Sequence, residues 1–151
     1  MLKSGSPKSL WYHCLELEAL IRSHTALYIY GLERQVPETV ISSQTGDISS
    51  LCEFEWFEWV MIFKQKENYP DDKMFIGRWL GPAIDVVTSM TYNILRPDGG
   101  YVCRSTLRSW TSNEEAKPVR MSERVSFMMH INSYIGHESK LSDLPLNDLN
   151  L

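Results

Sequence analysis

Four short segments between residues 51 and 108 carry the two-residue period of β-strands, and they constrain the fold of this chain more than any other feature. The segments are EFEWFEWVMIF (53–63), KMFIGRWL (73–80), SMTYNILR (89–96) and YVCRSTLR (101–108). Turn residues separate them at YPDD, GPAIDVVT and PDGG, and Asp98-Gly99 is a strong signal for a tight hairpin. Four short strands at this spacing predict a small antiparallel sheet or barrel.

Ahead of the strands, residues 9–27 have the period of an amphipathic helix, and Ser9 is placed to cap it. Its apolar side comprises Leu10, Trp11, Cys14, Leu15, Leu17, Leu20 and Ile21. A single helix of this kind is marginal in water, so we expect it to pack on another element. A second, short helix is predicted at 37–42, where Pro37 suits the first turn.

Beyond Trp110 the chain becomes polar, with a weak helical pattern at about 121–135 and a polar stretch after it. The predicted fold class is therefore α+β: an N-terminal helical segment, a small antiparallel β-sheet or barrel, and a partly helical or disordered tail. Shifts in composition divide the chain into residues 1–50, 51–112 and 113–151. Apolar residues make up 43% of the chain, which is enough to build a core.

The charge of the chain is unevenly distributed. Its net charge of −4 argues against a freestanding DNA-binding protein with a strongly basic face. Residues 61–110, however, carry seven Lys and Arg against five Asp and Glu. Six basic residues of the strand region are candidates to contact nucleic-acid phosphates on a small barrel: Lys64, Lys66, Lys73, Arg78, Arg104 and Arg108. The alternative is that they are ordinary surface charges.

Cysteine usage and hydropathy indicate the cellular compartment in which we expect the protein. Cys14, Cys52 and Cys103 are widely spaced and form no C-x-x-C pair, so neither a disulfide framework nor a zinc knuckle is expected. No uninterrupted apolar run exceeds the length of Trp59–Phe63, which is far too short to span a membrane, and no secretion leader opens the chain. These features predict an intracellular protein without a membrane partner.

No cofactor site is expected from the motifs. His13 and Cys14 are neighbours on a helix, so their side chains diverge by about 100° and could not easily share a metal. Glu53, Glu55 and Glu58 are typical of the outward face of a strand rather than of a metal cluster.

The stretch GRWLG, with glycines at 77 and 81, raises the question of a phosphate loop. It lacks the Lys-Ser/Thr ending of such a loop, and it lies inside a strand pattern rather than before a helix. A strand bulge and turn is therefore predicted, with Pro82 ending the strand.

Four stretches carry a resemblance to a known family. They are PKSLWYHCLELEALIRSHTA, QVPETVISSQTGDISSLCEFEWFEWV, DDKMFIGRWLGPA and YNILRPDGGYVCRSTLR. In this order, from about Pro7 to Glu115, they resemble the integrase region of copia-type LTR-retrotransposon polyproteins. The first resembles that family's helix with Trp near its start, and the others resemble its D-I-S, G-x-x-L-G and Y-x-I patterns. Ser43 and Glu55 stand where the family has glycine.

The resemblance implies that residues 1–50 come from the end of an RNase H-like catalytic core and that the strands form a C-terminal β-module that helps to hold DNA. The Asp, Asp and Glu that bind Mg²⁺ in the intact integrase would precede Met1. The resemblance therefore implies a non-catalytic fragment, without a cofactor of its own, that binds DNA weakly and nonspecifically. Self-association and binding to the remainder of a polyprotein stay open as further partners.

Two alternatives remain from the sequence. In the first, the chain is a protein-interaction module in which the sheet and the apolar stripe of helix 9–27 dock onto a partner. In the second, it is a non-functional remnant of a transposon. The acidic balance of the whole chain favours a protein partner, whereas the mildly basic middle favours DNA.

Overall fold

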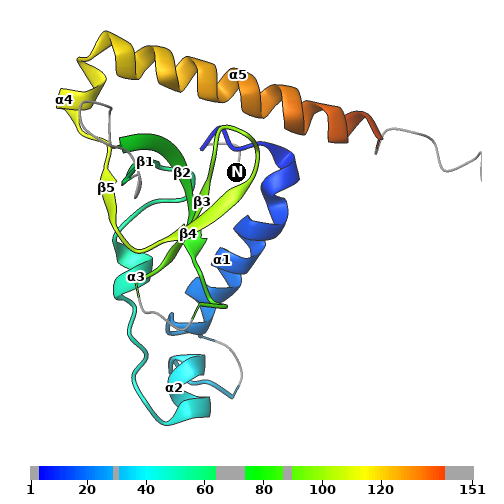
Figure 1. The fold of residues 1–151 in the computed structure, drawn as a ribbon. Coiled ribbons are helices and arrows are strands. Elements are labelled where there is room, and N and C mark those ends of the chain that lie inside the picture. Colours follow the sequence, from blue (N-terminus) through cyan, green and yellow to red (C-terminus); the bar gives the residue numbers. More distant parts are fainter. Residues whose placement is uncertain (1–3, 29–30, 64–73, 87–89, 142–151) are drawn as a thin grey trace, which may run out of the picture.

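The computed structural model describes residues 4–28, 31–63, 74–86 and 90–141, the last seven of them by backbone alone. Its first elements are η1 (Lys8–Leu10, a 3-10 helix), α1 (Trp11–Ser23), α2 (Pro37–Ser42) and α3 (Ser49–Cys52). The strands β1 (Trp59–Phe63), β2 (Met74–Pro82), β3 (Tyr92–Leu95), β4 (Tyr101–Arg104) and β5 (Leu107–Ser109) follow, and then the helices α4 (Ser112–Glu115) and α5 (Pro118–Leu141). Figure 1 shows this order in space. The predicted α+β class is confirmed.

The five strands form one antiparallel sheet in the order β4-β3-β2-β1-β5, and this sheet is curled. Neighbouring strands lie about 4.8 Å apart, so a flat sheet would separate its two edge strands by about 19 Å. Only Ser105 and Thr106 connect Arg104 to Leu107, and three residue steps reach at most about 11 Å. The sheet therefore bends until its edges β4 and β5 approach each other.

The segment 101–108, predicted as one strand, is thus two strands on opposite edges of the sheet. β4 pairs with β3 through the PDGG hairpin, and the hairpin prediction is confirmed. β5 pairs instead with β1, with Leu107 opposite Ile62. The alternating pattern of the segment did not reveal the break because both halves keep the period of a strand.

The two glycines of GRWLG fulfil different backbone requirements. Gly77 pairs with Val60, and a Cβ at Gly77 would lie 2.5 Å from Ile94 Cγ2 and 2.8 Å from Ile62 Cδ1. Gly81 has a φ of +123°, and the register between β2 and β3 shifts between Trp79 and Gly81. The predicted bulge is confirmed, as is the end of the strand at Pro82, the last residue of β2.

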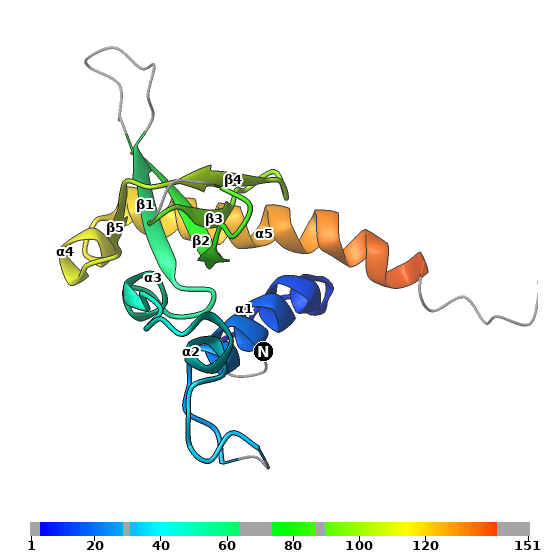
Figure 2. The same ribbon diagram turned by 90° about the horizontal axis from the view of Figure 1, so that it is seen from below.

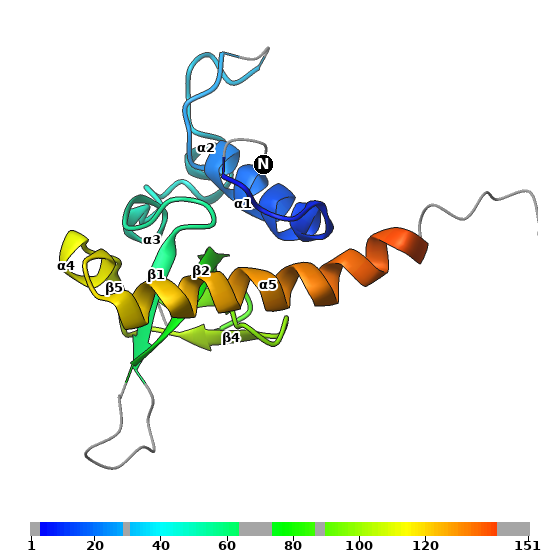
Figure 3. The same cartoon turned by 90° about the horizontal axis from the view of Figure 1, so that it is seen from above.

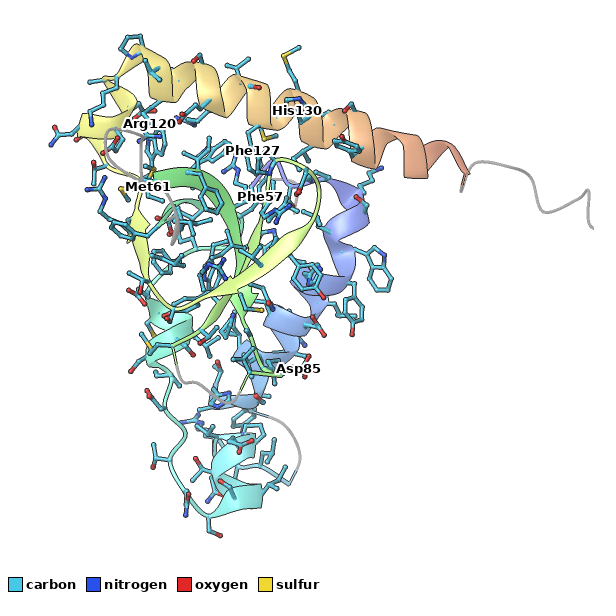
Figure 4. All side chains as sticks on the ribbon, viewed as in Figure 1. Phe57, Met61, Asp85, Arg120, Phe127 and His130 are labelled. Atoms are coloured by element: carbon cyan, nitrogen blue, oxygen red, sulfur yellow. The ribbon has the colours of Figure 1, made fainter. Side chains whose placement is uncertain are left out.

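Alternate positions of the strands supply two cores. One cluster joins Leu17 of α1 and Phe54 to one side of the sheet, together with Val60, Ile62, Trp79, Tyr92 and Ile94. The other lies between the sheet and α5 and contains Leu10, Phe57, Trp59, Met61, Ile76, Leu80, Leu95, Phe127 and Ile131. Figure 3 shows α5 crossing the sheet over β1 and β2, and Figure 4 shows Phe127 pointing toward Phe57 and the sheet. The helix α5 is therefore part of the core.

The segment 53–58 was predicted as the start of a strand, and that prediction is wrong. The helix α3 ends at Cys52, and Phe57 has a φ of +63°, which no strand allows. Phe57 N–H still donates to Trp79 O at 3.0 Å, so this turn delivers the chain directly to β1. The Tyr92 hydroxyl donates to the Glu53 carboxylate, which fastens the turn to β3.

The first helix is shorter than the predicted 9–27, whereas the predicted short helix at 37–42 is confirmed as α2. Ser9 lies within η1, and no side chain caps the start of α1. At the other end, the backbone N–H of His24 lies 3.3 Å from Leu20 O and 3.2 Å from Ile21 O. The Thr25 hydroxyl also donates to Ile21 O at 2.6 Å, so the last carbonyls of the helix are satisfied locally.

One buried carboxylate ties the C-terminal helices to the sheet. The Glu114 side chain, only 7% exposed, lies 2.6 Å from Arg108 of β5, 3.3 Å from Lys117 and 3.6 Å from Arg120 of α5. Burial alone would raise the pKa of this carboxyl, but the hydrogen bonds and charges of Lys117 and Arg108 outweigh it and lower the pKa. Glu114 is therefore ionised in the folded protein at neutral pH.

We expect Glu114→Gln to lower the free energy of unfolding at pH 7 by about 2 kcal/mol, because it removes the charged acceptor of several hydrogen bonds. A lowered pKa in the folded state stabilises the protein above the ordinary pKa of 4.5, and this stabilisation is lost as the pH falls through the folded value. Urea denaturation at pH 7 and pH ~3 should therefore show that the difference in free energy of unfolding between the native protein and Glu114→Gln shrinks in acid. A difference that stays constant over this range would contradict the lowered pKa of Glu114.

Candidate binding site on helix α1

The described residues among the predicted phosphate contacts do not lie together on one face of the molecule. Lys64, Lys66 and Lys73 lie outside the described residues. The guanidinium of Arg78 lies 3.5 Å from the centroid of the Trp59 ring, under α5, and donates to Phe57 O at 2.6 Å. Burial, and then the charge of Arg124, lower the pKa of Arg78 to about 9, so it remains cationic at neutral pH.

Arg104 and Arg108 flank the two-residue connection between β4 and β5. Arg108 Nη2 lies 2.6 Å from Glu114 Oε1, so its charge is compensated within the fold. Arg104 Nη1 donates to Cys103 O at 2.9 Å, and among the described residues it has no carboxylate partner. Of the three predicted residues that are described, Arg78 and Arg104 have no described carboxylate partner, and Arg78 is held against the Trp59 ring.

The residues that we considered as metal ligands make other contacts in the structure. His13 Nδ1 lies 3.7 Å from Glu16 Oε2, and Cys14 follows it as a half-buried free thiol. Glu58 Oε2 accepts the backbone N–H of Glu55 at 2.8 Å. Within the described residues, no three His, Cys, Asp or Glu side chains come together as a metal site would require.

A row of four rings joins the start of α1 to β4. Trp11 and Tyr12 meet edge to face with centroids 6.1 Å apart, Tyr12 and His13 at 5.8 Å, and His13 and Tyr101 at 5.7 Å. Such edge-to-face contacts hold rings in a defined arrangement. Trp11 is nevertheless 59% exposed and Tyr101 61% exposed. We call Trp11, Tyr12, His13 and Tyr101 the aromatic row.

A pocket of about 200 Å³ adjoins the aromatic row, between α1 and the end of β2. Its lining residues are His13, Glu16, Leu17, Leu20, Leu80, Gly81, Pro82, Ile84, Asp85 and Asn93. The side chain of Leu17 packs on the backbone of the bulge, 3.6 Å from where a Cβ of Gly81 would lie. The helix α1 and the end of β2 lie side by side (Figure 2). Residues of both elements line the pocket.

The electrostatics of the pocket are negative. Glu16 and Asp85 are its two described carboxylates, and no lysine or arginine of the described residues lines it. A hydrogen bond to Glu16 and the charge of Glu16, then burial, and last the charge of Asp85 raise the pKa of the Tyr12 hydroxyl. Figure 4 places Asp85 beside α1, the helix that carries Glu16, and both carboxylates line the pocket.

Sequence reasoning missed this site almost completely. Trp11 was assigned to the apolar side of a helix that packs, but α1 buries Leu17 and leaves Trp11, Tyr12 and Leu15 exposed. Asp85 was treated as a turn residue, and Tyr101 as a strand residue. The signal that could have been found was the cluster WYH at 11–13, since three adjacent ring-bearing residues cannot all face one core.

The class that the fold defines is a small α+β domain with a curled five-stranded antiparallel sheet between two helices. Comparisons with family models, curated proteins and solved structures found no match. Within the described residues, no helix has the length and apolar character needed to cross a bilayer. Function therefore has to be inferred from the geometry of the site.

Proposed function

We propose that this chain is a non-catalytic protein-interaction module that binds a basic peptide segment along the aromatic row. The observation that carries the proposal is the exposure of Trp11, Tyr12 and Tyr101 in a connected row of rings beside two carboxylates. Exposed tryptophan and tyrosine side chains are the residues that most often dominate the energetics of protein interfaces. The carboxylates of Glu16 and Asp85 make a positively charged partner complementary.

The charges elsewhere on the molecule support a protein partner over DNA. The described basic side chains of the C-terminal half are largely compensated by carboxylates: Arg96 by Asp98, Arg108 and Lys117 by Glu114, Arg120 by Glu123, and Arg124 by Glu115. A nucleic-acid interface needs uncompensated cations that can displace counterions from phosphates. The acidic balance of the whole chain points in the same direction.

We further propose that the module derives from a copia-type integrase region, which its motifs resemble. In that setting the β-module would act as a docking element and would carry no chemistry of its own. The basic peptide would then belong to another segment of the polyprotein or to a protein of the integration complex.

Random-peptide display on the purified chain tests the proposed function. We expect selected peptides to lose about tenfold in affinity when Trp11 or Tyr101 is replaced by alanine, because truncating a central aromatic contact commonly costs more than 1 kcal/mol. The matched control is Ile41→Ala, which removes an apolar side chain that is 83% exposed on α2. Peptides that bind the Trp11→Ala and Ile41→Ala proteins equally well would overturn the proposal.

Weak, nonspecific DNA binding is the second candidate, and the uncompensated Arg104 is the observation that favours it. If it holds, affinity for a duplex should fall between 50 and 200 mM salt by about tenfold for every two phosphates contacted. Arg104→Gln should reduce the slope of this salt dependence, whereas Trp11→Ala should not. Duplex binding that ignores salt would contradict the phosphate contact.

A further inference from the structure

We propose that the pocket between α1 and the end of β2 binds the cationic end of a lysine or arginine side chain from the partner peptide. This inference rests on the proposed function and names the group that the module recognises. It follows from three properties of the pocket: its charge, its apolar walls and its position beside the aromatic row.

The charge of the pocket selects a cation. Glu16 comes from the second turn of α1 and Asp85 from the segment after β2, so the two carboxylates approach the pocket from different elements. The carboxylate of Glu16 is 42% exposed, and therefore still reachable by a ligand, while its neighbour His13 lies 3.7 Å away. An anion placed here would meet two like charges and no lysine or arginine among the lining residues.

The walls of the pocket suit the stem of a long side chain. Leucines at 17, 20 and 80 line it together with Pro82 and Ile84. Lysine and arginine bury an aliphatic stem against such surfaces while their charged end reaches polar groups. The volume of about 200 Å³ is more than ten times the ~15 Å³ that one water needs, so the pocket is much larger than a site for a single ion.

The aromatic row extends the same recognition to the mouth of the pocket. His13 lines the pocket and also meets the Tyr101 ring, while Tyr12 lies between His13 and Trp11 in the row. Aromatic faces attract ammonium and guanidinium groups through their quadrupoles. A cationic side chain that enters along the row therefore meets favourable partners before it reaches Glu16 and Asp85.

The test uses the whole chain, isotope-labelled, and two small probes followed by NMR. The first probe is N-acetyl-lysine methylamide, and the second is its side-chain acetylated form, which keeps the stem and removes the charge. We expect the charged probe to shift the amide signals of Gly81 and Asn93 and to lower the pKa of Tyr12, because it offsets the carboxylates that raise it. The neutral probe should do neither.

Two variants and a control locate the binding. Glu16→Gln and Asp85→Asn should each lower the affinity for the charged probe by about fivefold, the upper range for one exposed ion pair. Glu18→Gln removes the same charge from the same helix at a carboxylate that pairs with Arg22 and does not line the pocket, and it should leave the affinity unchanged. The amide spectra of the free variants show whether each one keeps the fold.

The outcomes separate this inference from the proposed function. Equal binding of both probes, or equal weakening by Glu18→Gln, would overturn the cation site. Displayed peptides that depend on Trp11 but contain no lysine or arginine would overturn it as well, while leaving the interaction module standing. A charged probe that binds the pocket, with no peptide that depends on the aromatic row, would instead overturn the proposed function and keep the pocket.

Discussion

Replacing Phe127 by alanine should lower the free energy of unfolding by about 4 kcal/mol, the largest single effect that we expect in this protein. Phe127 is only 2% exposed, and its ring meets Trp59 edge to face with centroids 5.1 Å apart. The substitution would leave a cavity between α5 and the sheet, and it would also remove an aromatic pair. Urea denaturation followed by tryptophan fluorescence measures the change.

The matched control on the same helix is Val125→Ala. Val125 is 59% exposed, so its truncation should change the stability by no more than about 0.5 kcal/mol. If Phe127→Ala leaves too little folded protein to measure, Phe127→Leu fills part of the cavity and should cost about 1.5 kcal/mol. A cost for Phe127→Ala close to that of the control would mean that α5 is a tail that adds little to the core.

Replacing Gly77 by alanine should lower the free energy of unfolding by about 3 kcal/mol, since overpacking a well-filled core typically costs 1–3 kcal/mol. A Cβ there would lie 2.5 Å from Ile94 Cγ2, 2.8 Å from Ile62 Cδ1 and 3.0 Å from the backbone oxygen of Leu95. The side chains of Ile62 and Ile94 are fully buried, and a backbone atom of the sheet cannot move away cheaply. Chemical denaturation gives the measurement.

Gly100→Ala is the matched control for this prediction. Gly100 is exposed in the hairpin, has no positive φ, and a Cβ there would lie 3.3 Å from the carboxylate of the exposed Asp98. That side chain can rotate away, so we expect a change within about 0.5 kcal/mol. A cost below about 1 kcal/mol for Gly77→Ala would show that the interior of the curled sheet yields more readily than its contacts indicate.

Local patterns were enough for most elements of the fold. The strand patterns at 59–63 and 74–80 became paired strands, and Asp98-Gly99 became the hairpin, because both signals depend on neighbouring residues alone. The strand predicted at 53–58 from alternating acidic and aromatic residues does not form, because Phe57 has a left-handed backbone conformation. A sequence period of two carries no information about φ. The packing of α5 also escaped prediction, since Phe127 and Ile131 are too few to dominate a polar helix.

The candidate site depended on long-range contacts far more than the elements did. The basic residues chosen for a phosphate face share a sign of charge, but Arg78 lies against Trp59 and Arg108 against Glu114. The aromatic row and the acidic pocket combine residues from α1, the end of β2 and β4. Their separation in the chain, from 11 to 101, hid the relation until the sheet brought them together.

By itself, the sequence determined where most of the strands and the helices α1 and α2 form, that GRWLG is a bulged strand, and that the net charge is negative, because propensity, turn chemistry and charge act over a few residues. The tertiary structure decided that the sheet curls, that Gly77 must lack a side chain, and that Trp11, Tyr101, Glu16 and Asp85 belong to one surface. These depend on which side chains meet across the fold, and burial and pairing set that only once the whole chain is folded.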